Sequence, residues 1–514
     1  MKFTVLVFGC QMNYSDTARI KAVLMHCGWS YVETIDEADV VIFDTCSVRQ
    51  KSEDKVTGKL MNLDPSKKVR ITGCMIQHNL RNMVIKRKTQ KKSITGLMGV
   101  GNFVWTVETI APDVIGLTNL EIEERRPKPG MESNIAYINH AFNPMFHTLH
   151  TTYPNVELFF RIDDTGFLPL MMQRIGYDVQ FDGELTNEYT AIIPQSTSMH
   201  AATSQISAFI PISTGCSQFC AFCIVPYARG VEKYLDVDQI VAEAKHHIDH
   251  GIAEITLLGQ IVNKHPRFVE ICQRILDLPG SLQWLRYTSP YPTFYDTWLL
   301  DLHASDPRMC PHIHMPLQSG SDRILKKMFR GYTSQQFRDF VNQIRAIEAS
   351  HGRKVSITSD VIVGFCDETE EDFQQTLDLI EYARFDMIYI GKYSTRPGTY
   401  AARRYEDDVS QAVKDERRER LNVILKKISS DNNHGEIGKR KKVLVTKKKA
   451  WETEGLRDWE IRYDYSGYTE DMKHINFLYQ KNPSEWEILH VGQFVDIVVT
   501  GGESFILRGE IVRF

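Results

Sequence analysis

Short apolar segments and amphipathic segments alternate along residues 1–80 of the chain. The apolar segments predict strands, and the segments with a helical period predict helices between them. Strands are expected at residues 4–8, 40–44 and 69–72, and helices at residues 15–27 and 50–60. Such alternation is typical of a parallel sheet, whose ligands gather at the carboxyl ends of the strands. We therefore predict an N-terminal parallel α/β domain.

The same alternation returns between residues 207 and 404. Six strand–helix units over about 200 residues are typical of a full or partial βα barrel, with its site at the carboxyl ends of the strands. The expected strands are residues 210–214, 254–258, 284–288, 312–317, 356–363 and 387–393, and clear helices are residues 237–250, 335–350 and 370–383.

The C-terminal part has a different pattern. A charged helix at residues 415–430 is expected to be a connector, and residues 439–514 contain five short strand patterns with Gly-containing turns. Short, evenly spaced strands predict a small antiparallel β-barrel. The resulting domains are 1–206, 207–430 and 439–514, with an insertion of loops, short helices and some strand at about 81–206.

Composition narrows the class of protein. The chain is 42% hydrophobic and 10% aromatic with a net charge of −4, which excludes a disordered chain and a wholly basic surface. No apolar run reaches the length of a membrane span, and no secretory signal is evident, so we expect a cytoplasmic protein without membrane contact. In a reducing compartment its ten cysteines are thiols or metal ligands.

Three of these cysteines lie in one short loop, directly after the first barrel strand. The loop reads Cys216-Ser-Gln-Phe-Cys220-Ala-Phe-Cys223. Three thiolates can hold an iron–sulfur cluster and leave one iron open to a small molecule. Structural zinc favours four ligands and a thioredoxin-like pair uses two, so both alternatives fit less well.

Cys10, Cys46 and Cys74 each follow a predicted parallel strand of the N-terminal domain. They could converge at one edge of the sheet. Spacing alone supports a second cluster and three packing thiols equally, because buried cysteine commonly behaves as a small hydrophobe. Cys27 and Cys272 are interpreted as helix packing, and Cys310 and Cys366 have no matching partner pattern.

The loop at residues 215–232 resembles the signature of radical S-adenosylmethionine methylthiotransferases, and the flanks of Cys10, Cys46 and Cys74 resemble their N-terminal domain. The resemblance implies two 4Fe-4S clusters. One would bind S-adenosylmethionine for reductive cleavage to a 5′-deoxyadenosyl radical. The other would supply or carry sulfur, and a second S-adenosylmethionine would donate the methyl group. No catalytic side chain beyond the cluster ligands is implied.

Within that family the chain is most similar to the tRNA-2-methylthio-N6-dimethylallyladenosine synthases (MiaB type). The supporting segments are residues 9–13, 46–49, 314–321, 330–333 and 392–399. This implies a monomer that methylthiolates C2 of an N6-prenylated adenosine in the tRNA anticodon loop, with an external electron donor and an unidentified sulfur source. The alternatives are another tRNA adenosine, a ribosomal protein, or a non-catalytic iron–sulfur RNA-binding protein.

Residues after the barrel strands are matched to cofactor binding by the same resemblance, although each is also compatible with a simple turn or a solvated side chain. They are Gly259, Gln260, Gln318, Ser319, Gly364 and Arg396. Other positions depart from the family pattern: Tyr234, Leu235, Ile261, Phe329, Cys366 and Asp367, with Asp44 in place of Asn.

The C-terminal barrel resembles a TRAM domain, the family's RNA-binding module. Residues 414–449 contain 13 Lys and Arg against 5 Asp and Glu, a surplus that could meet phosphates or belong to a solvated helix. Four aromatic residues are expected either to stack on bases or, for most of them, to fill the barrel core: Trp451, Trp459, Tyr463 and Tyr465.

Overall fold

The structure is a computed structural model, and it describes residues 1–47, 50–78, 148–149, 151–179, 206–450, 462–480 and 489–512. These residues form two compact units. The first contains the described residues up to 179 together with Thr214–Ser217 and Cys223–Leu235, and the second contains the remainder. Arg49, Trp451, Trp459 and most of the predicted insertion lie outside the described residues. The three predicted domain boundaries stay predictions.

The first unit is built on a five-stranded parallel sheet with the order β2-β1-β3-β4-β5. Its strands are β1 (Lys2–Phe8), β2 (Ser30–Tyr31), β3 (Val40–Thr45), β4 (Lys68–Gly73) and β5 (Val156–Phe159). Its helices include α1 (Gln11–His26), α2 (Gln50–Met61) and α6 (Leu168–Arg174). The predicted parallel α/β domain is confirmed, and β5 shows that part of the predicted insertion extends this sheet.

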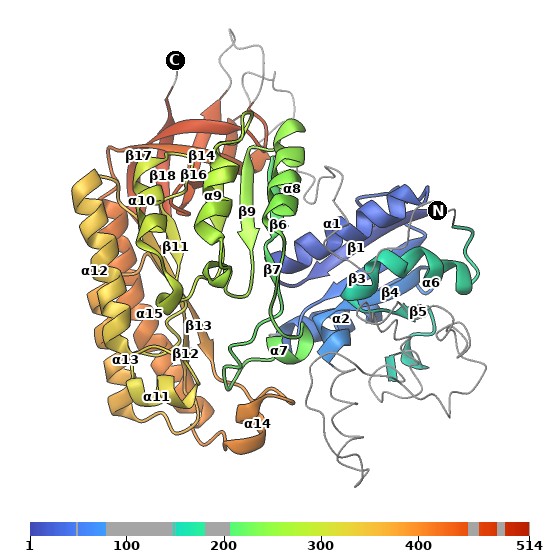
Figure 1. Cartoon of the computed structure of the whole chain (residues 1–514), viewed down its shortest axis with the longest axis horizontal. Helices are drawn as coiled ribbons and strands as arrows, with labels where there is room; N and C mark the ends of the chain where they lie inside the picture. The colour runs from blue at the N-terminus through green and yellow to red at the C-terminus, as the bar shows by residue number, and fades with distance from the viewer. Residues whose placement is uncertain are drawn as a thin grey trace. The chain divides into compact units, whose positions relative to one another are not determined.

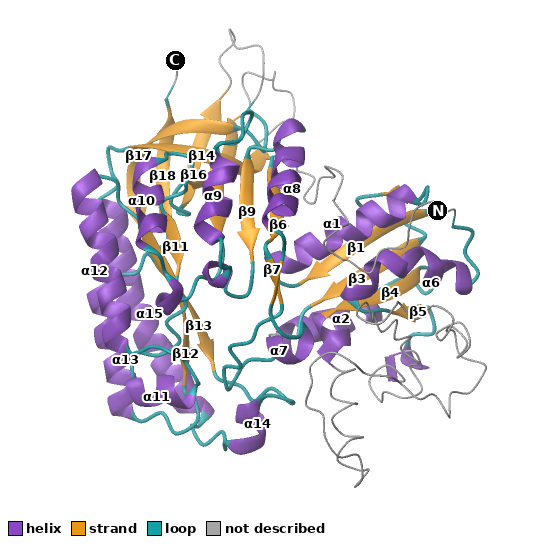
Figure 2. Cartoon of the chain, viewed as in Figure 1, coloured by secondary structure: helices purple, strands orange, loops and turns teal. Residues whose placement is uncertain are grey.

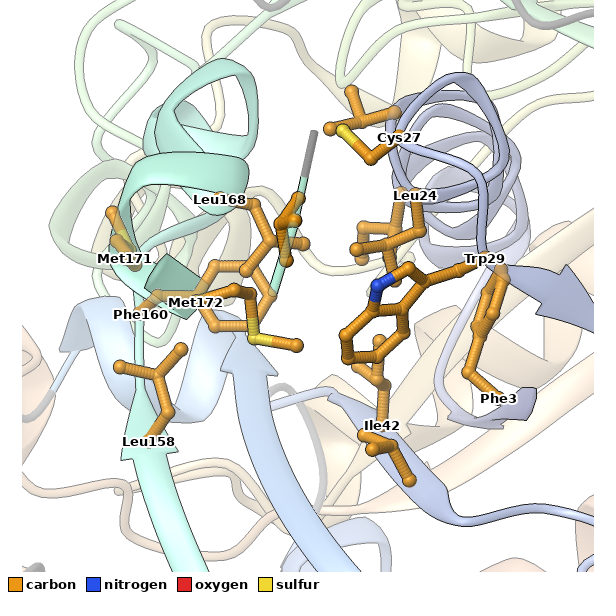
Figure 3. Packing of buried hydrophobic residues seen from close by; sticks show 14 of the residues in the cluster. Phe3, Leu24, Cys27, Trp29, Ile42, Leu158, Phe160, Leu168, Met171 and Met172 are labelled. Atoms are coloured by element: carbon orange, nitrogen blue, oxygen red, sulfur yellow. The ribbon is translucent and has the colours of Figure 1, made fainter. Parts of the chain in front are cut away.

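Apolar residues cover both faces of the sheet. On one face α1 and α6 enclose a core in which Trp29 lies between Leu24, Met172 and Ile42 (Figure 3). Cys27 belongs to this core, so its interpretation as a packing residue is confirmed. On the other face Val56 and Leu60 of α2 pack against the strands. Burial on both sides explains the continuous apolar runs of β1 and β3.

Helix α1 begins four residues earlier than predicted. Its N-cap is Cys10, and the side chain of Asn13 accepts a hydrogen bond from the Cys10 backbone N–H at 3.1 Å. The predicted start at residue 15 was wrong, because Asn13 lies in the first turn of the helix and the N-cap is a cysteine, an uncommon residue at that position.

Six parallel strands form the predicted partial barrel in the second unit. They lie in two three-stranded sheets, β10-β9-β6 and β11-β12-β13, and a parallel bridge pairs Leu285 with Met309 between them. The strands are β6 (Ser207–Pro211), β9 (Glu254–Leu258), β10 (Trp284–Tyr287), β11 (His312–His314), β12 (Ser356–Val363) and β13 (Met387–Lys392). Between β6 and β9, the two-residue strands β7 (Ser213–Thr214) and β8 (Lys233–Tyr234) pair with each other.

Helices cover the outside of these sheets (Figures 1 and 2). They are α8 (Val237–Asp249), α9 (Phe268–Leu276), α10 (Thr297–Ser305), α12 (Ser334–His351) and α13 (Glu370–Ala383), while the short helices α11 (Asp322–Lys327) and α14 (Tyr400–Arg404) follow β11 and β13. Good caps explain several boundaries: the hydroxyls of Thr333 and Thr369 accept from the third backbone N–H of α12 and α13 in capping boxes. No helix in the described part of the chain is both long and apolar enough to cross a membrane.

The C-terminal strands close into a barrel with the order β14-β15-β16-β18-β17. They are β14 (Arg440–Ala450), β15 (Arg462–Thr469), β16 (His474–Gln480), β17 (Phe494–Glu503) and β18 (Ile506–Ile511). The pairing of β16 with β18 is parallel and the other neighbouring pairs are antiparallel. Tyr463 and Tyr465 lie in the barrel core, as expected for most of these aromatics.

The connector helix is longer than predicted and is not a solvated linker. Helix α15 (Gln411–His434) buries Leu421, Leu425 and Ile428 and packs against β13 and β17. Three basic residues of the predicted phosphate-binding surplus are committed to buried ion pairs. They are Lys414 with Asp407, Arg417 with Glu368, and Lys441 with Glu436 and Asp471. The prediction overcounted available charge because a sequence does not show which lysines are buried.

The turn between β15 and β16 docks at the amino ends of the barrel strands through buried charges. Lys473 pairs with Asp386, just before β13, and its ammonium donates to Asn433 Oδ1 at 3.0 Å. Arg286 donates to the carbonyls of Thr469 and Glu470 at 3.1 and 2.8 Å. This charged lock joins the C-terminal barrel to the βα barrel.

Removing one partner of the lock should be costly, because it leaves a buried charge unpaired. We expect Asp386→Ala to lower the free energy of unfolding by about 3–5 kcal/mol. The matched control, Glu503→Ala, removes an exposed partner of Arg508 and should cost less than about 1 kcal/mol. Urea unfolding followed by the fluorescence of buried Trp284 measures both. Equal losses would contradict the lock.

Candidate functional site

Three cysteines of the first unit lie at one edge of its sheet. Cys10 follows β1, Cys46 follows β3 and Cys74 follows β4, and these strands are hydrogen-bonded neighbours in register through Phe8, Thr45 and Gly73. Cys10 is exposed, whereas Cys46 and Cys74 are buried. Parallel topology therefore places three thiols together, as the sequence predicted.

Their environments differ. A hydrogen bond with Cys46, helped by the charge of Arg229, lowers the pKa of the Cys10 thiol to about 6. Burial raises the pKa of the Cys74 thiol to about 11. A metal bound to both would favour the thiolate form of each, since thiolates are the binding form of cysteine.

Arg229 is the cation at this edge. It directly follows α7 (Val225–Ala228), a helical turn of the cysteine loop, and is buried with Asp16. Its Nε donates to Cys74 Sγ at 3.1 Å, and its terminal nitrogen donates to Asp16 Oδ2 at 2.5 Å. Arg229 lies in the segment 215–232 that resembles the family signature, but the sequence did not predict its contact with Cys74. Its place close after the cysteine loop is the one sequence feature that points to such a role.

A second carboxyl group, that of Asp44, lies near Asp16. Asp44 is fully buried at the end of β3, where it accepts hydrogen bonds from Asn13 Nδ2 at 2.8 Å and Thr17 Oγ1 at 3.2 Å. Burial, together with the nearby Asp16, raises the pKa of Asp44 well above its ordinary value. The departure from the usual Asn thus keeps the hydrogen bonds while adding an acidic group.

Cys10, Cys46 and Cys74 supply the donor type that iron–sulfur clusters use, because thiolates are the usual ligands of such clusters. Among the described residues, no three His, Cys, Asp or Glu side chains are grouped as ligands of a single metal ion. The three cysteines therefore stay predicted ligands of a second cluster.

The loop from Cys216 to Cys223 is held by its backbone. The N–H of Cys216 donates to the Gly230 carbonyl at 3.0 Å, and the N–H of Ala221 donates to the Met328 carbonyl at 2.9 Å. Gly215 has φ of +72°, and a Cβ there would lie 2.2 Å from the Val231 carbonyl oxygen, so the turn requires glycine.

Cys220 has an arginine neighbour of its own. Arg330 donates from a terminal nitrogen to Cys220 Sγ at 3.3 Å and to the Pro316 carbonyl at 3.2 Å. Its guanidinium also lies 4.5 Å from the ring centre of Tyr291. Each cysteine triplet therefore contains one thiol that accepts a hydrogen bond from a partly buried arginine.

The residues matched to cofactor binding lie after β9, β11, β12 and β13. Gly364 has φ of +68°, and a Cβ there would lie 2.3 Å from Lys414. Gln318 pairs through its backbone with β12, and Ser319 is buried with its hydroxyl near Thr376. Gly259 faces Ser213. With Gln260 and Arg396, they stay predictions for the cofactor site.

Backbone conformation accounts for part of the departures from the family pattern. Phe329 and Asp367 stand where Asn and Gly are usual, and both have positive φ, +59° and +65°. Asn and Gly tolerate that region best. Phe329 packs on Tyr400 with ring centres 4.7 Å apart, and Cys366 is buried among apolar side chains. The remaining departures follow no such rule: Tyr234 is exposed, and Leu235 and Ile261 are buried.

A substitution at Gly73 tests whether the ends of β3 and β4 need the close backbone approach seen between Gly73 and Thr45. Its φ is +96°, and a Cβ would lie 2.2 Å from the Thr45 carbonyl oxygen. We expect Gly73→Ala to cost the left-handed strain of about 1–2 kcal/mol and about 1–3 kcal/mol more for the clash. The control, Gly28→Ala, has φ of +81° with nothing within 4 Å and should cost only the strain. Urea unfolding of iron-free protein measures the difference, and equal losses would contradict this geometry.

Two family models match the chain. The model described as "Radical SAM superfamily" matches residues 210–380, and the model described as "Uncharacterized protein family UPF0004" matches residues 2–96. The first spans the Cys216–Cys223 loop and the strands β9 to β12 of the partial barrel. The second includes Cys10, Cys46 and Cys74.

Curated relatives match nearly the whole chain. Proteins named tRNA-2-methylthio-N(6)-dimethylallyladenosine synthase are 31% identical in Corynebacterium urealyticum, over 98% of this chain and 81% of the relative, and 31% in Mycolicibacterium smegmatis, over 97% and 85%. The relative from Oceanobacillus iheyensis is 30% identical over 100% of this chain and 84% of its own length. The chain therefore belongs to the family of tRNA-2-methylthio-N6-dimethylallyladenosine synthases, enzymes of the radical SAM superfamily.

Proposed function

We propose that the chain converts the C2–H of an N6-prenylated adenosine beside the tRNA anticodon into C2–S–CH3. The observation that carries the proposal is the presence of two cysteine triplets, each with a partly buried arginine donating to one thiol, in a chain of this family. A target in the anticodon loop is unpaired, so its base can enter the enzyme without melting a duplex.

The radical SAM fold implies one 4Fe-4S cluster and S-adenosylmethionine. Cys216, Cys220 and Cys223 would hold this cluster, which when bound would supply the electron for reductive cleavage of S-adenosylmethionine to methionine and a hydrogen-abstracting 5′-deoxyadenosyl radical. An aromatic C–H has no practical polar route at neutral pH, and this explains the need for a radical cofactor. An external donor provides the electron.

We also propose that Cys10, Cys46 and Cys74 hold a second 4Fe-4S cluster, which takes part in sulfur transfer. Three converging thiols and the adjacent Arg229 support this assignment. Arginine keeps its charge at all working pH values, so Arg229 offsets the negative charge that three thiolates bring to a buried site. Asp16 fixes the guanidinium in place and shares its positive charge with the thiolates.

In this proposal Arg330 offsets the negative charge of the Cys220 thiolate, as Arg229 does at Cys74. Its guanidinium is held by Tyr291 and the Pro316 carbonyl, so it can donate to the thiolate without reorganising. The backbone bonds of Cys216 and Ala221 fix the loop that carries the ligands. These residues orient the cluster and do not exchange protons with the substrate.

A basic pocket on the C-terminal barrel supports tRNA binding. Its volume is about 590 Å³, and the residues lining it are Thr446, Lys447, Lys448, Lys449, Asp464, Tyr465, Ser466, Asn476 and Val491. Lys447 and Lys449 are exposed, while Lys448 lies 4.2 Å from the ring centre of Tyr463. We propose that this pocket holds phosphates of the tRNA backbone.

Loss of these lysines should weaken tRNA binding in a salt-dependent way. We expect Lys447→Ala/Lys449→Ala to reduce the slope of log affinity against log salt by up to about 2, as two phosphate contacts disappear. Filter binding of prenylated tRNA at several salt concentrations measures the slope. The control Arg508→Ala removes an exposed charge of the same barrel that is paired with Glu503. An equal slope for the double variant and wild type would contradict the assignment.

The function is tested by anaerobic reconstitution with prenylated tRNA, S-adenosylmethionine, sulfide and a reductant. We expect wild-type protein to form both 5′-deoxyadenosine and the 2-methylthio nucleoside, detected by mass spectrometry. Cys46→Ala should keep 5′-deoxyadenosine formation and lose the methylthio product, because only the second cluster loses a ligand. Cys272→Ala, a buried position on α9, should retain both products. Wild-type protein that cleaves S-adenosylmethionine without thiolating prenylated tRNA would contradict the proposal.

A further inference from the structure

The inner face of the sheet β11-β12-β13 contains a row of polar side chains. Residues that alternate with them, such as Ile357 and Val361 of β12 and Ile388 of β13, are buried on the opposite face. The inner face contains His312, His314, Thr358, Asp360 and Tyr389, and register pairs His314 with Thr358 and Asp360 with Tyr389. The proposed reaction chemistry uses none of these side chains.

A chain of hydrogen bonds orients Asp360. Thr358 Oγ1 lies 2.9 Å from both His312 Nε2 and His314 Nδ1, which fixes the His314 ring. Because a carboxylate only accepts hydrogen bonds, His314 Nε2 donates to Asp360 Oδ2 at 3.1 Å. One carboxylate oxygen is thus engaged, and the half-exposed Asp360 can present the other to a ligand.

Tyr389 lies directly beside Asp360 and is unusually exposed for an aromatic residue, at 52%. Its ring contacts His314 edge to face, with centres 5.8 Å apart, so the ring is supported from one side. The next residue of β13 on this face is Gly391, and a Cβ there would meet only the Val361 carbonyl oxygen, at 3.9 Å. An aromatic surface, a fixed acceptor and open space therefore adjoin one another.

We infer that Tyr389 and Asp360 bind the base of the target nucleoside: the purine stacks on the Tyr389 ring and its N6–H donates to Asp360. This inference rests on the proposed function. Stacking on an aromatic side chain is the common way to hold an unpaired base. An N6-prenylated adenine keeps a single N–H on its exocyclic nitrogen, which matches the single carboxylate oxygen not engaged by His314.

The two residues select and place the base. His314 and Thr358 are positioning residues that act through Asp360, since they contact the carboxylate or its partner. S-Adenosylmethionine also carries an adenine, so the test must distinguish binding of that adenine from binding of the target base of the RNA. We assign the site to RNA for two reasons. A prenylated N6 has one N–H to donate to Asp360, and the prenyl group needs space, which the absence of a side chain at Gly391 provides.

The test uses anticodon stem-loop RNA and full-length reconstituted enzyme, with dissociation constants from fluorescence anisotropy. One probe carries N6-prenylated adenosine beside the anticodon, and the other carries 6-prenyloxypurine riboside, which keeps the prenyl group and has an oxygen in place of the N6–H. We expect wild-type protein to bind the prenyloxy probe about tenfold more weakly, because a hydrogen bond to a charged acceptor is lost. Asp360→Asn should bind the two probes with affinities within about twofold, while His314→Asn should narrow the difference partly, by releasing Asp360.

Tyr389 variants test the stacking surface. Tyr389→Ala should weaken both probes by about tenfold, whereas Tyr389→Phe should retain wild-type affinity. The matched controls are Asp378→Asn and Tyr382→Ala on α13, which are exposed outside the sheet and should leave both affinities unchanged. Equilibrium dialysis of S-adenosylmethionine without RNA identifies the source of the adenine.

Two results would overturn the inference. The first is a wild-type protein that does not distinguish the probes. The second is Asp360→Asn or Tyr389→Ala weakening S-adenosylmethionine binding while RNA binding is unchanged. Failure of the proposed function looks different: the enzyme would discriminate the probes and yet form no methylthio nucleoside.

Discussion

A thiolate cluster held inside a protein requires a positive charge beside it, and both of the cysteine sites proposed to hold a cluster have one. Arg229 donates to Cys74 and Arg330 donates to Cys220, and each guanidinium is partly buried and fixed by further contacts. A buried charge without a partner costs several kcal/mol, about 3–5 when one partner of a pair is removed. The arginines and the thiolates therefore stabilise each other, and the loops that carry them must fold together.

Much of this architecture follows from local sequence patterns. Three apolar strands, each followed by a cysteine, predict the convergence of Cys10, Cys46 and Cys74, because parallel strands end at a common edge. Two features of the site were missed, since they depend on tertiary contacts. The thiol cap of Cys10 has no propensity signal, and Asp16, 213 residues before Arg229, shows its partner only in the folded chain.

The C-terminal half shows the same division between pattern and packing. Strand patterns predicted the closed barrel, whereas the burial of α15 was not predicted because its charged residues disguise a narrow apolar stripe through Leu421, Leu425 and Ile428. Basic residues in this region serve two purposes. Lys473 helps to fix the C-terminal barrel to the βα barrel, and Lys441 pairs with Asp471 in the same turn. Exposed Lys447 and Lys449 line the pocket that is proposed to bind phosphates. A count of charged residues in the sequence does not distinguish lysines in buried ion pairs from exposed lysines.

The central claim is that one chain holds two four-iron clusters. Iron and sulfide analysis of protein purified without oxygen tests it most directly, in wild type and in a variant with Cys216, Cys220 and Cys223 all replaced by alanine. The account predicts about eight irons per chain in wild type and about four in the variant, which keeps Cys10, Cys46 and Cys74. A wild-type content of about four irons, with none in the variant, would contradict it.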